Sequence, residues 1–230
     1  MQAVILAGGL ATRLRPLSEK NPKSMVLVNK KPFLEYQLNL FKRSGVFDVL
    51  LCVGHLGESI EGYFGDGKKF GVNLTYSRER KRLLGTAGAL KNAEKLLEKE
   101  FFLIYGDSYL PMNYREPLEL FHSLDKMGLN VVYKNHDKYE KSNMAVKDGL
   151  VIKYSNDEGR DLVYIDAGLS IFKKRVLELI PSNQVFQLTE VFNKLIRKRE
   201  LLAFEAKQRF YQIGSFGGLE EVRKLLTENS

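Results

Sequence analysis

The segment from Val4 to Met25, VILAGGLATRLRPLSEKNPKSM, places a bare backbone turn and several cations close together. Gly8 and Gly9 carry no side chain, so their N–H groups can approach a ligand closely, and successive N–H groups favour anions. Arg13 follows in the same loop, where a guanidinium can bind phosphate oxygens in pairs. Lys23 comes directly after a proline that restricts the backbone, so its ammonium can be aimed as a point charge. This order predicts a nucleoside triphosphate site.

Two better-known phosphate-binding patterns do not occur in the chain. Neither G-x-x-x-x-G-K-[ST] nor G-x-G-x-x-G is present. The alternative interpretation of the segment is a tight turn followed by a solvated basic loop. The combination of an apolar run, two glycines, Thr-Arg-x-Arg-Pro and Pro-Lys favours phosphate binding over that alternative.

Asp107 ends the continuous apolar run FFLIYGD at 101–107. A carboxylate at the end of a buried strand suits Mg²⁺, which prefers hard oxygen ligands and commonly takes one or two carboxylates plus substrate phosphates. The alternative role is that of a helix N-cap, which aspartate also fills well.

The charge balance favours anionic partners. Lys and Arg number 36 against 28 acidic residues, which gives a net charge of +8 in 230 residues. A nucleic-acid partner is not expected, because the basic clusters lack interleaved aromatic residues. The single cysteine, Cys52, excludes a disulfide framework and lies among aliphatic residues, where a buried thiol is expected. No leader-like or membrane-spanning stretch is evident, so we expect a cytoplasmic protein with no membrane partner.

Short apolar runs alternate with helical patterns in the first half of the chain. Strands are expected at 3–7, 48–54, 72–77 and 101–107, and helices at 32–45, 58–64 and 86–99. This alternation predicts a mostly parallel sheet with helices on both faces and a ligand crevice at the carboxyl ends of the strands. The second half is richer in strands, with helices expected at 185–199 and 217–226. We expect one domain over 1–230, with the predicted nucleotide site in a first half at about 1–128 and a second half at about 129–230 that extends the sheet.

The motif LAGGLATRLRPLSEKNPKSMVLVNKKP, from Leu6 to Pro32, resembles the signature of the sugar-phosphate nucleotidyltransferases, or NDP-sugar pyrophosphorylases. The likeness continues through LLGTAGAL, YGDSY, DAGLSIF and YQIGSFGGL. The chain is most similar to short, single-domain members such as heptose-1-phosphate guanylyltransferases and N-acetylmuramate-1-phosphate uridylyltransferases. The implied fold is an α/β, Rossmann-like three-layer αβα arrangement with a mostly parallel mixed sheet and a small additional β-rich sugar-binding lobe.

The resemblance also implies roles for individual residues. Backbone groups of Leu6, Ala7, Gly8 and Gly9 hold the base and ribose, and Thr12 and Arg13 hold the triphosphate. Arg13, Lys23 and Asp107 carry catalysis, with Lys23 between the α-phosphate and the sugar phosphate and Asp107 on Mg²⁺. Gly85 and Gly88 lie near the base and sugar.

The chain departs from the family pattern at three places. Ala11 replaces a loop glycine, and Lys153 is only a weak match to a lysine that grips the sugar phosphate in some relatives. Gln212 stands where a second metal carboxylate is expected, so it is predicted to bind Mg²⁺ through its carbonyl oxygen or a water. Glu79, Asn143 and Asp166 are candidate sugar contacts, with exposed polar side chains as the alternative for the first two.

The predicted reaction is the transfer of a nucleoside monophosphate from an NTP to a sugar 1-phosphate, which yields an NDP-sugar and pyrophosphate for cell-surface glycan synthesis. GTP and heptose 1-phosphate are favoured, and UTP, dTTP and CTP stay open. Because of Gln212, a non-catalytic nucleotide-sugar-binding regulator is the alternative. The resemblance leaves homo-oligomerisation open.

Overall fold

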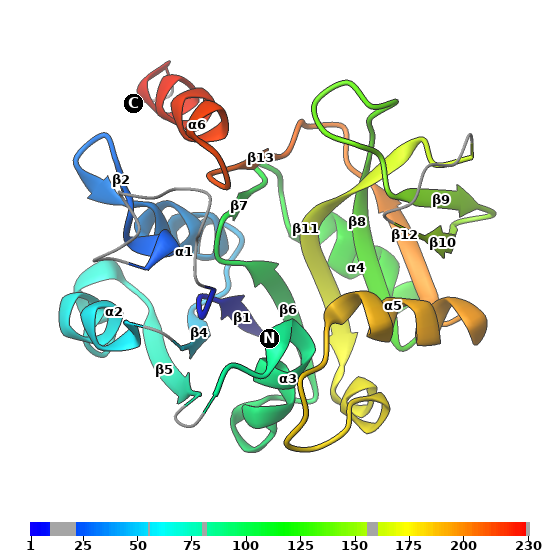
Figure 1. The fold of residues 1–230 in the computed structure, drawn as a ribbon, viewed down its shortest axis with the longest axis horizontal. Coiled ribbons are helices and arrows are strands. Elements are labelled where there is room, and N and C mark those ends of the chain that lie inside the picture. The colour runs from blue at the N-terminus through cyan, green and yellow to red at the C-terminus, as the bar shows by residue number, and fades with distance from the viewer. Residues whose placement is uncertain (10–21, 55, 80–81, 156–160, 229–230) are drawn as a thin grey trace.

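The computed structural model of the chain describes residues 1–9, 22–54, 56–79, 82–155 and 161–228 (Figure 1). Thr12 and Arg13, the predicted triphosphate ligands, lie outside these residues, as does Ala11. Within the described residues, no helix combines the length and the apolar character needed to cross a bilayer.

A nine-stranded mixed sheet runs through both halves of the chain in the order β5-β4-β1-β6-β11-β8-β12-β10-β9. The first four strands are parallel, as predicted for the nucleotide-binding half. β11 is antiparallel to both of its neighbours, β6 and β8. The strands are β1 (Gln2–Leu6), β4 (Asp48–Val53), β5 (Asn73–Arg78), β6 (Glu100–Tyr105), β8 (Gly128–Lys134), β9 (Met144–Lys147), β10 (Leu150–Tyr154), β11 (Tyr164–Lys173) and β12 (Leu201–Glu205).

Two further strand pairs lie outside the large sheet. β2 (Leu27–Val28) and β3 (Lys31–Pro32) form a hairpin whose turn residues, Asn29 and Lys30, both have positive φ. Asparagine tolerates this left-handed conformation, which a two-residue hairpin turn requires. β7 (Ser108–Tyr109) pairs with β13 (Tyr211–Gln212), so a late segment of the chain lies beside the end of β6.

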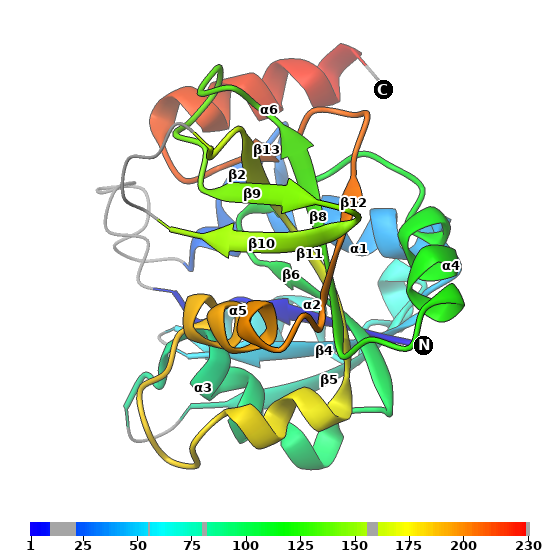
Figure 2. The same cartoon turned by 90° about the vertical axis from the view of Figure 1, so that its right-hand side faces the viewer.

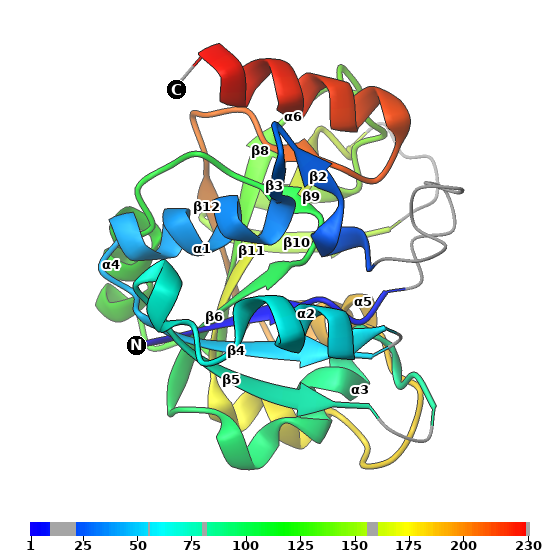
Figure 3. The same cartoon turned by 90° about the vertical axis from the view of Figure 1, so that its left-hand side faces the viewer.

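Helices cover both faces of the sheet (Figures 2 and 3). Successive side chains of β1 alternate between two cores: Ala3 and Ile5 pack in one core and Val4 in the other. The first core includes residues of α1, α2, α4 and α6, and the second includes residues of α3 and α5. The helices are α1 (Phe33–Arg43), α2 (Gly57–Phe64), α3 (Gly85–Asn92), α4 (Arg115–Ser123), α5 (Leu188–Arg197) and α6 (Phe216–Glu228), with 3₁₀ turns at Lys23–Met25, Lys68–Phe70, Glu94–Leu96 and Lys174–Leu179.

The predicted helices are largely present, but two boundaries differ by three or more residues and one helix is additional. The helix expected at 86–99 ends at Asn92, because the chain turns back into β6 through a bend that the Gln2 side chain fixes with bonds to Leu96 O and Glu98 N. The helix expected at 185–199 begins at Leu188, because the residues before it pack on α3. α4 was not expected; Pro117 lies in its first turn, where a missing N–H leaves no helix bond unmade.

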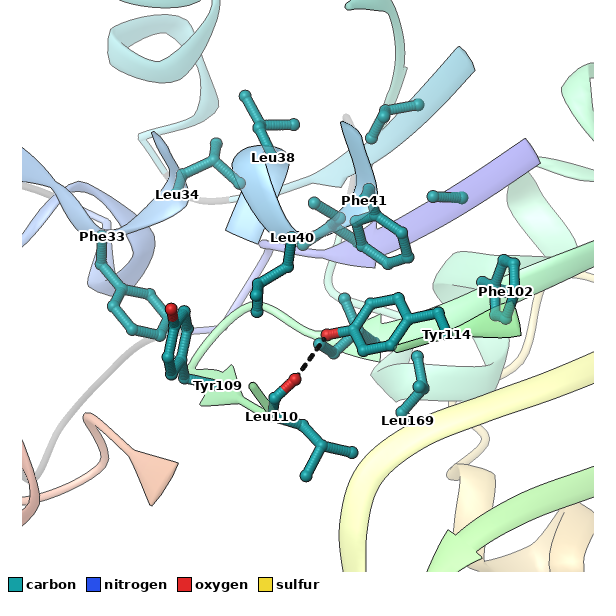
Figure 4. Close-up of a cluster of buried hydrophobic side chains, with 14 of the residues drawn as sticks. Phe33, Leu34, Leu38, Leu40, Phe41, Phe102, Tyr109, Leu110, Tyr114 and Leu169 are labelled. Atoms are coloured by element: carbon teal, nitrogen blue, oxygen red, sulfur yellow. Dashed lines mark hydrogen bonds between the residues drawn. The ribbon is translucent and has the colours of Figure 1, made fainter. Parts of the chain in front are cut away.

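A cluster of aromatic side chains anchors the segment that follows β6 (Figure 4). Phe33 and Phe41 of α1 contact Tyr109 and Tyr114, with ring centroids 6.3 and 5.2 Å apart. The Tyr114 hydroxyl donates to Leu110 O at 3.1 Å. Full burial of these rings fixes the path of the chain just beyond Asp107.

Candidate active site

The carboxyl ends of β5, β4, β1 and β6 meet around a cavity of about 280 Å³. Main-chain bonds hold the strand ends together: Ala7 N donates to Cys52 O at 2.8 Å, and Gly106 N donates to Leu6 O at 3.0 Å. We call this the first cavity. Among the predicted site residues, its walls include Leu6, Ala7, Gly8, Gly9, Lys23, Glu79, Gly85 and Asp107.

Glycine is required at position 8 because neighbouring atoms leave no space for a side chain, and not because its φ is positive. A Cβ at this position would lie 3.0 Å from Glu79 Oε2 and 3.2 Å from Gly54 N. Beside it, a Cβ at Gly9 would meet nothing within 4 Å. The backbone of Gly8 and Gly9 therefore lines the first cavity without side chains, and the backbone contact to a ligand stays a prediction.

Gly85 and Gly88 do not share one environment. Gly85 lines the first cavity and has a φ of +75°, and a Cβ there would lie 2.7 Å from Gln187 Nε2. A Cβ at Gly88 would instead meet Gln184 O at 2.9 Å, on the helix side away from the cavity lining. Gly88 thus allows the segment before α5 to pack on α3, and Phe186 O accepts from the N–H of Gly88 at 3.1 Å.

Lys23 and Asp107 form an ion pair at the edge of the first cavity. Their side chains are only 16% and 23% exposed, so the charges are partly shielded from water. The Ser24 hydroxyl lies next to this pair in sequence and in the cavity wall, and it is buried without a hydrogen-bond partner among the described residues. The site therefore combines a cation, a carboxylate and an unsatisfied hydroxyl, which suits a phosphate ligand better than an apolar one.

A buried glutamine of α1 positions Asp107. Gln37 is 0% exposed, and its Nε2 donates to Tyr105 O at 2.8 Å and to Ser108 O at 2.7 Å, on either side of the aspartate. From the C-terminal region, Ile213 N donates to Asp107 O at 2.9 Å. The turn that presents the carboxylate is thus fixed by three hydrogen bonds.

A second cavity of about 480 Å³ adjoins the first and shares Tyr105 and Asp107 with it. Asn143, Asp166 and Gln212 line this second cavity, together with Tyr154 and Gly168. Three of the predicted residues are therefore brought together on the far side of Asp107 from the glycine wall.

Asp166 is held by a network of hydrogen bonds at an irregularity in the pairing of β11 with β8. Its Oδ1 accepts from Asn130 Nδ2 at 3.1 Å and from Gly168 N at 2.8 Å, while its backbone N–H donates to Asn143 Oδ1 at 3.0 Å. Burial raises the pKa of the Asp166 carboxyl to about 6, and the bonds from Gly168 and Asn130 oppose that rise. A carboxyl in this state can accept or donate a hydrogen bond near neutral pH.

Gln212 lies on β13, directly opposite Ser108 of β7. It lines the second cavity with Asp107. Within the described residues, no group of three His, Cys, Asp or Glu side chains is arranged to hold a metal ion. Asp107 and Gln212 thus present one carboxylate and one neutral amide to the second cavity.

The structure does not bring Glu79 together with Asn143 and Asp166. Glu79 follows β5, and β4, β1 and β6 separate that strand from β11, which carries Asp166. Glu79 therefore lies in the first cavity and not among the predicted sugar contacts. Lys153, the weak phosphate candidate, is an exposed residue paired with Asp161 at 3.2 Å.

Cys52 is buried, as expected, at the end of β4. Burial raises the pKa of its thiol to about 12, so it packs as a small apolar group and does not supply a thiolate.

Three further residues, Gln37, Thr86 and Gln187, contribute to the site and were not predicted from the sequence. Gln187 Oε1 accepts from the Thr86 hydroxyl at 3.1 Å across 101 residues of chain, and both residues line the first cavity. A local sequence pattern does not predict a contact between residues so far apart in the chain. Position 37 lies four residues from both Phe33 and Phe41, so helical spacing places it on the same buried face, but the polarity of glutamine gave no sign of its role.

Comparisons with known proteins agree with this geometry. A family model described as nucleotidyl transferase matches residues 2–229. The chain is 31% identical over 214 residues to D-glycero-alpha-D-manno-heptose 1-phosphate guanylyltransferase of Campylobacter jejuni, with 93% of this chain and 95% of that protein covered. It is 29% identical over 221 residues to UTP–glucose-1-phosphate uridylyltransferase of Synechocystis, of which it spans about half, 55% of the length.

Among solved structures, HddC from Yersinia pseudotuberculosis complexed with GMP-PN superimposes with a TM-score of 0.82 at 27% identity, covering 98% of this chain and 99% of that one. The predicted fold class is thereby confirmed. The chain therefore belongs to the nucleotidyl transferase family and is an enzyme of the sugar-1-phosphate nucleotidyltransferase class, which its sequence also resembles.

Proposed function

We propose that this chain transfers a guanylyl group from GTP to a heptose 1-phosphate or a closely related sugar 1-phosphate, releasing pyrophosphate. The observation that carries the proposal is the pair of adjoining cavities that share Asp107, with Lys23 bound to that residue. We call Lys23 and Asp107, where the two cavities meet, the junction. The arrangement fits two separate substrates that each place a phosphate at this junction. Volumes of about 280 and 480 Å³ are of the order expected for small-molecule sites.

In this proposal the first cavity holds the nucleotide. The wall of Leu6, Ala7, Gly8 and Gly9 contacts the base and ribose, and Gly85 closes the opposite side. Thr12 and Arg13 hold the triphosphate; their roles rest on the family resemblance alone. Gly88 contributes by letting the segment before α5 approach α3 and not by touching the nucleotide.

The reaction needs little covalent chemistry from the protein. A phosphate oxygen of the sugar 1-phosphate attacks the α-phosphorus, a new P–O bond forms, and the bond to the bridging oxygen of the β-phosphate breaks with its electrons leaving on pyrophosphate. The nucleophile is already an anion, so no general base is required. Lys23 neutralises charge where the two phosphates meet and holds them in line.

The donors near Asp107 fit Mg²⁺ when substrate phosphates complete the set. Mg²⁺ commonly binds through one or two carboxylates plus substrate phosphates, and Asp107 supplies one carboxylate. Gln212 adds a carbonyl oxygen or orders a water in the same cavity. Bound there, the ion would offset the negative charge that builds on the transferred phosphate.

The second cavity would bind the sugar. Asn143 and Asp166 present polar groups to it, and their mutual bond through the Asp166 backbone keeps them in fixed relation. Sugar hydroxyls both donate and accept, which suits a carboxyl and an amide. Glu79 takes no part in sugar binding in this proposal.

The choice of GTP and of a heptose-type sugar is supported by the Campylobacter relative's name and by the GMP-PN bound to the Yersinia protein. The Synechocystis relative keeps UTP as the alternative. We further propose that the product serves cell-surface glycan synthesis in the cytoplasm.

A matrix of GTP, UTP, dTTP and CTP against sugar 1-phosphates, with pyrophosphate detection, tests the proposal. We expect the highest kcat/KM for GTP with a heptose or mannose 1-phosphate. Nucleotide binding without pyrophosphate release from any pair would instead favour a regulator. Preferred turnover of another NTP would overturn the base assignment and leave the reaction in place.

A further inference from the structure

A third cavity of about 560 Å³ lies beside the second, and the proposed function assigns it no ligand. The second and third cavities share Glu140, Lys141 and Gln212. Within the described residues, the third cavity has no lining residue in common with the first. A ligand in the third cavity would therefore be continuous with the sugar and not with the nucleotide.

Arg209 lines the third cavity and holds its guanidinium between two aromatic rings. Its Cζ lies 3.7 Å from the ring centre of Tyr139 and 4.7 Å from that of Tyr211. Tyr139 belongs to the loop between β8 and β9, and Tyr211 belongs to β13, so two distant parts of the chain form the stack (Figure 2). Stacking of this kind fixes the plane of a guanidinium and leaves the N–H groups on its edge for hydrogen bonds.

The guanidinium of Arg209 has hydrogen-bonding capacity left over. Nη2 donates to Glu221 Oε2 of α6 at 2.6 Å, and no other hydrogen bond of this side chain forms within the described residues. Arginine carries five N–H donors, so the bond to Glu221 leaves donors for a further anion. The side chain is only 24% exposed, so partial shielding from water would strengthen its attraction for that anion.

The charges around the third cavity favour an anionic ligand. Lys138 is exposed at its rim, and Lys141 lines both this cavity and the second. The carboxylates of Glu140 and Glu221 also line it, and Glu221 is already paired with Arg209. Three cations against two carboxylates give the cavity a net positive charge, which attracts anions.

The loop that carries Tyr139 is held in shape by its own hydrogen bonds. The buried side chain of Asn135 donates to Glu140 O at 2.6 Å and accepts from Tyr139 N at 3.2 Å. Asp137 and Ser142 exchange two bonds, since Ser142 N donates to Asp137 Oδ1 at 2.7 Å and Asp137 N donates to Ser142 Oγ at 3.0 Å. This side of the third cavity is therefore formed before a ligand arrives, which lowers the entropic cost of binding.

Arg209 lies close to the proposed sugar site. It precedes Gln212 by three residues, so their Cα atoms are at most about 11 Å apart. Gln212 in turn lines the second cavity together with Asp107. A sugar with its 1-phosphate at Asp107 can thus extend a substituent past Gln212 toward the guanidinium.

We infer that the third cavity binds an anionic substituent of the sugar 1-phosphate, either a carboxylate or a second phosphate, with Arg209 as its main contact. This inference rests on the proposed function and narrows its substrate class to acidic sugar 1-phosphates. The preference for a heptose or mannose 1-phosphate concerns the carbon skeleton, to which the inference adds an acidic group.

The test compares pairs of sugar 1-phosphates that differ in an acidic group, with Mg²⁺, GTP or the NTP that turns over fastest, and pyrophosphate detection. Mannose 1,6-bisphosphate against mannose 1-phosphate tests a second phosphate. Glucuronic acid 1-phosphate against glucose 1-phosphate tests a carboxylate. We expect kcat/KM to be about 10- to 100-fold higher for the acidic member of at least one pair, mainly through KM, the range for charge-assisted hydrogen bonds to one arginine.

Arg209→Gln should remove most of this preference for the acidic sugar. The ratio of kcat/KM within a pair is measured on one protein, so a partial loss of folded enzyme cancels from it. Lys138→Gln, at an exposed position, should lower the ratio about 3-fold without affecting the fold. Arg197→Gln is the matched control, because Arg197 is an exposed arginine at the end of α5, and it should leave the ratio unchanged.

The outcomes separate this inference from the proposed function. Equal or lower kcat/KM for the acidic member of both pairs would overturn the inference, as would a preference that survives unchanged in Arg209→Gln. An acidic sugar that alters turnover of its neutral partner without being consumed would indicate an effector site and would also overturn it. Turnover of the neutral sugars would in each case leave the proposed function in place, whereas no pyrophosphate release from any combination would overturn that function itself.

Discussion

The first and second cavities meet at Asp107 but are built in different ways. The first lies at the carboxyl ends of parallel strands, and part of its wall is backbone at Gly8 and Gly106, where too little space is left for a side chain. The second depends on side chains such as Asn143 and Asp166, which come from the antiparallel part of the sheet. A backbone wall recognises what all nucleotides share, whereas a side-chain network can change from one sugar to another without altering the fold.

The contrast extends to electrostatics. At the junction, the charges of Lys23 and Asp107 balance each other in an ion pair. In the second cavity, the buried carboxyl of Asp166 accepts hydrogen bonds only from neutral donors among the described residues. Substitutions at the junction should therefore affect the reaction itself, and substitutions in the second cavity should affect one substrate and the pH dependence of stability.

The largest effect is expected at the junction. Lys23→Ala and Asp107→Asn should each lower kcat by about 10²- to 10³-fold, because each removes a charge that the transition state needs. Pyrophosphate release under saturating substrates measures this, and thermal unfolding checks the fold. Lys68→Ala, which breaks the exposed pair with Asp66, is the control and should retain full activity. Near-normal turnover in both junction variants would refute the shared role of the two cavities.

An intermediate effect is expected at Gln37, which positions Asp107 without facing either cavity. Gln37→Leu leaves two buried carbonyls unpaired and should lower the free energy of unfolding by about 2 kcal/mol. It should also lower kcat about 10-fold or more through misplacement of the carboxylate, while the Kd for nucleotide without metal stays unchanged. Gln208→Leu, at an exposed position, serves as the control. A loss of stability with normal kcat would assign Gln37 a structural role only.

The smallest effect on turnover, and the clearest pH signature, is expected in the second cavity. Asp166→Asn keeps the acceptor for Asn130 and Gly168 and should raise the KM for sugar phosphate about 10-fold with little change for the nucleotide. In the wild type, the native state retains a proton up to about pH 6 that the unfolded chain releases near pH 4. Stability conferred by this proton should therefore fall as pH rises through that window and stay low above it.

The side chain at position 166 of the asparagine variant cannot titrate, so this fall in stability between about pH 4 and pH 6 should be absent from the variant. At pH 8 it should be more stable than the wild type, by at most about 3 kcal/mol. Urea unfolding at pH 4, 5, 6 and 8 measures both curves. Parallel curves for the two proteins would mean that the Asp166 carboxyl is not perturbed.

Within the first cavity, the sequence indicated the residues at strand ends but not the residues placed by strand order or by long-range contacts. Residues 6–9 and 107 lie at the ends of apolar runs, and parallel strands bring such ends to one edge of a sheet. The location of Glu79 depended on strand order, which the pattern of apolar residues does not encode. The contact of Gln187 with Thr86 joins residues 101 positions apart, so neither periodicity nor a motif could reveal it.

Helix boundaries failed where tertiary contacts overrode local preference. Apolar spacing favoured a helix through Leu97, yet Gln2 fixes the bend that ends it. α5 begins later than expected because Phe186 O accepts hydrogen bonds from Ala87 N and Gly88 N in the first turn of α3.

The last helix has a consequence for the order in which the protein becomes active during synthesis. The side chain of Asn29, in the hairpin just after Lys23, donates to Arg223 O and to the Thr227 hydroxyl of α6, and Ile213 N donates to Asp107 O. The hairpin that follows Lys23 and the backbone of Asp107 are thus both braced by residues between 213 and 227. Much of the sheet can form before these residues are synthesised, but the reactive centre matures only after α6 has been made.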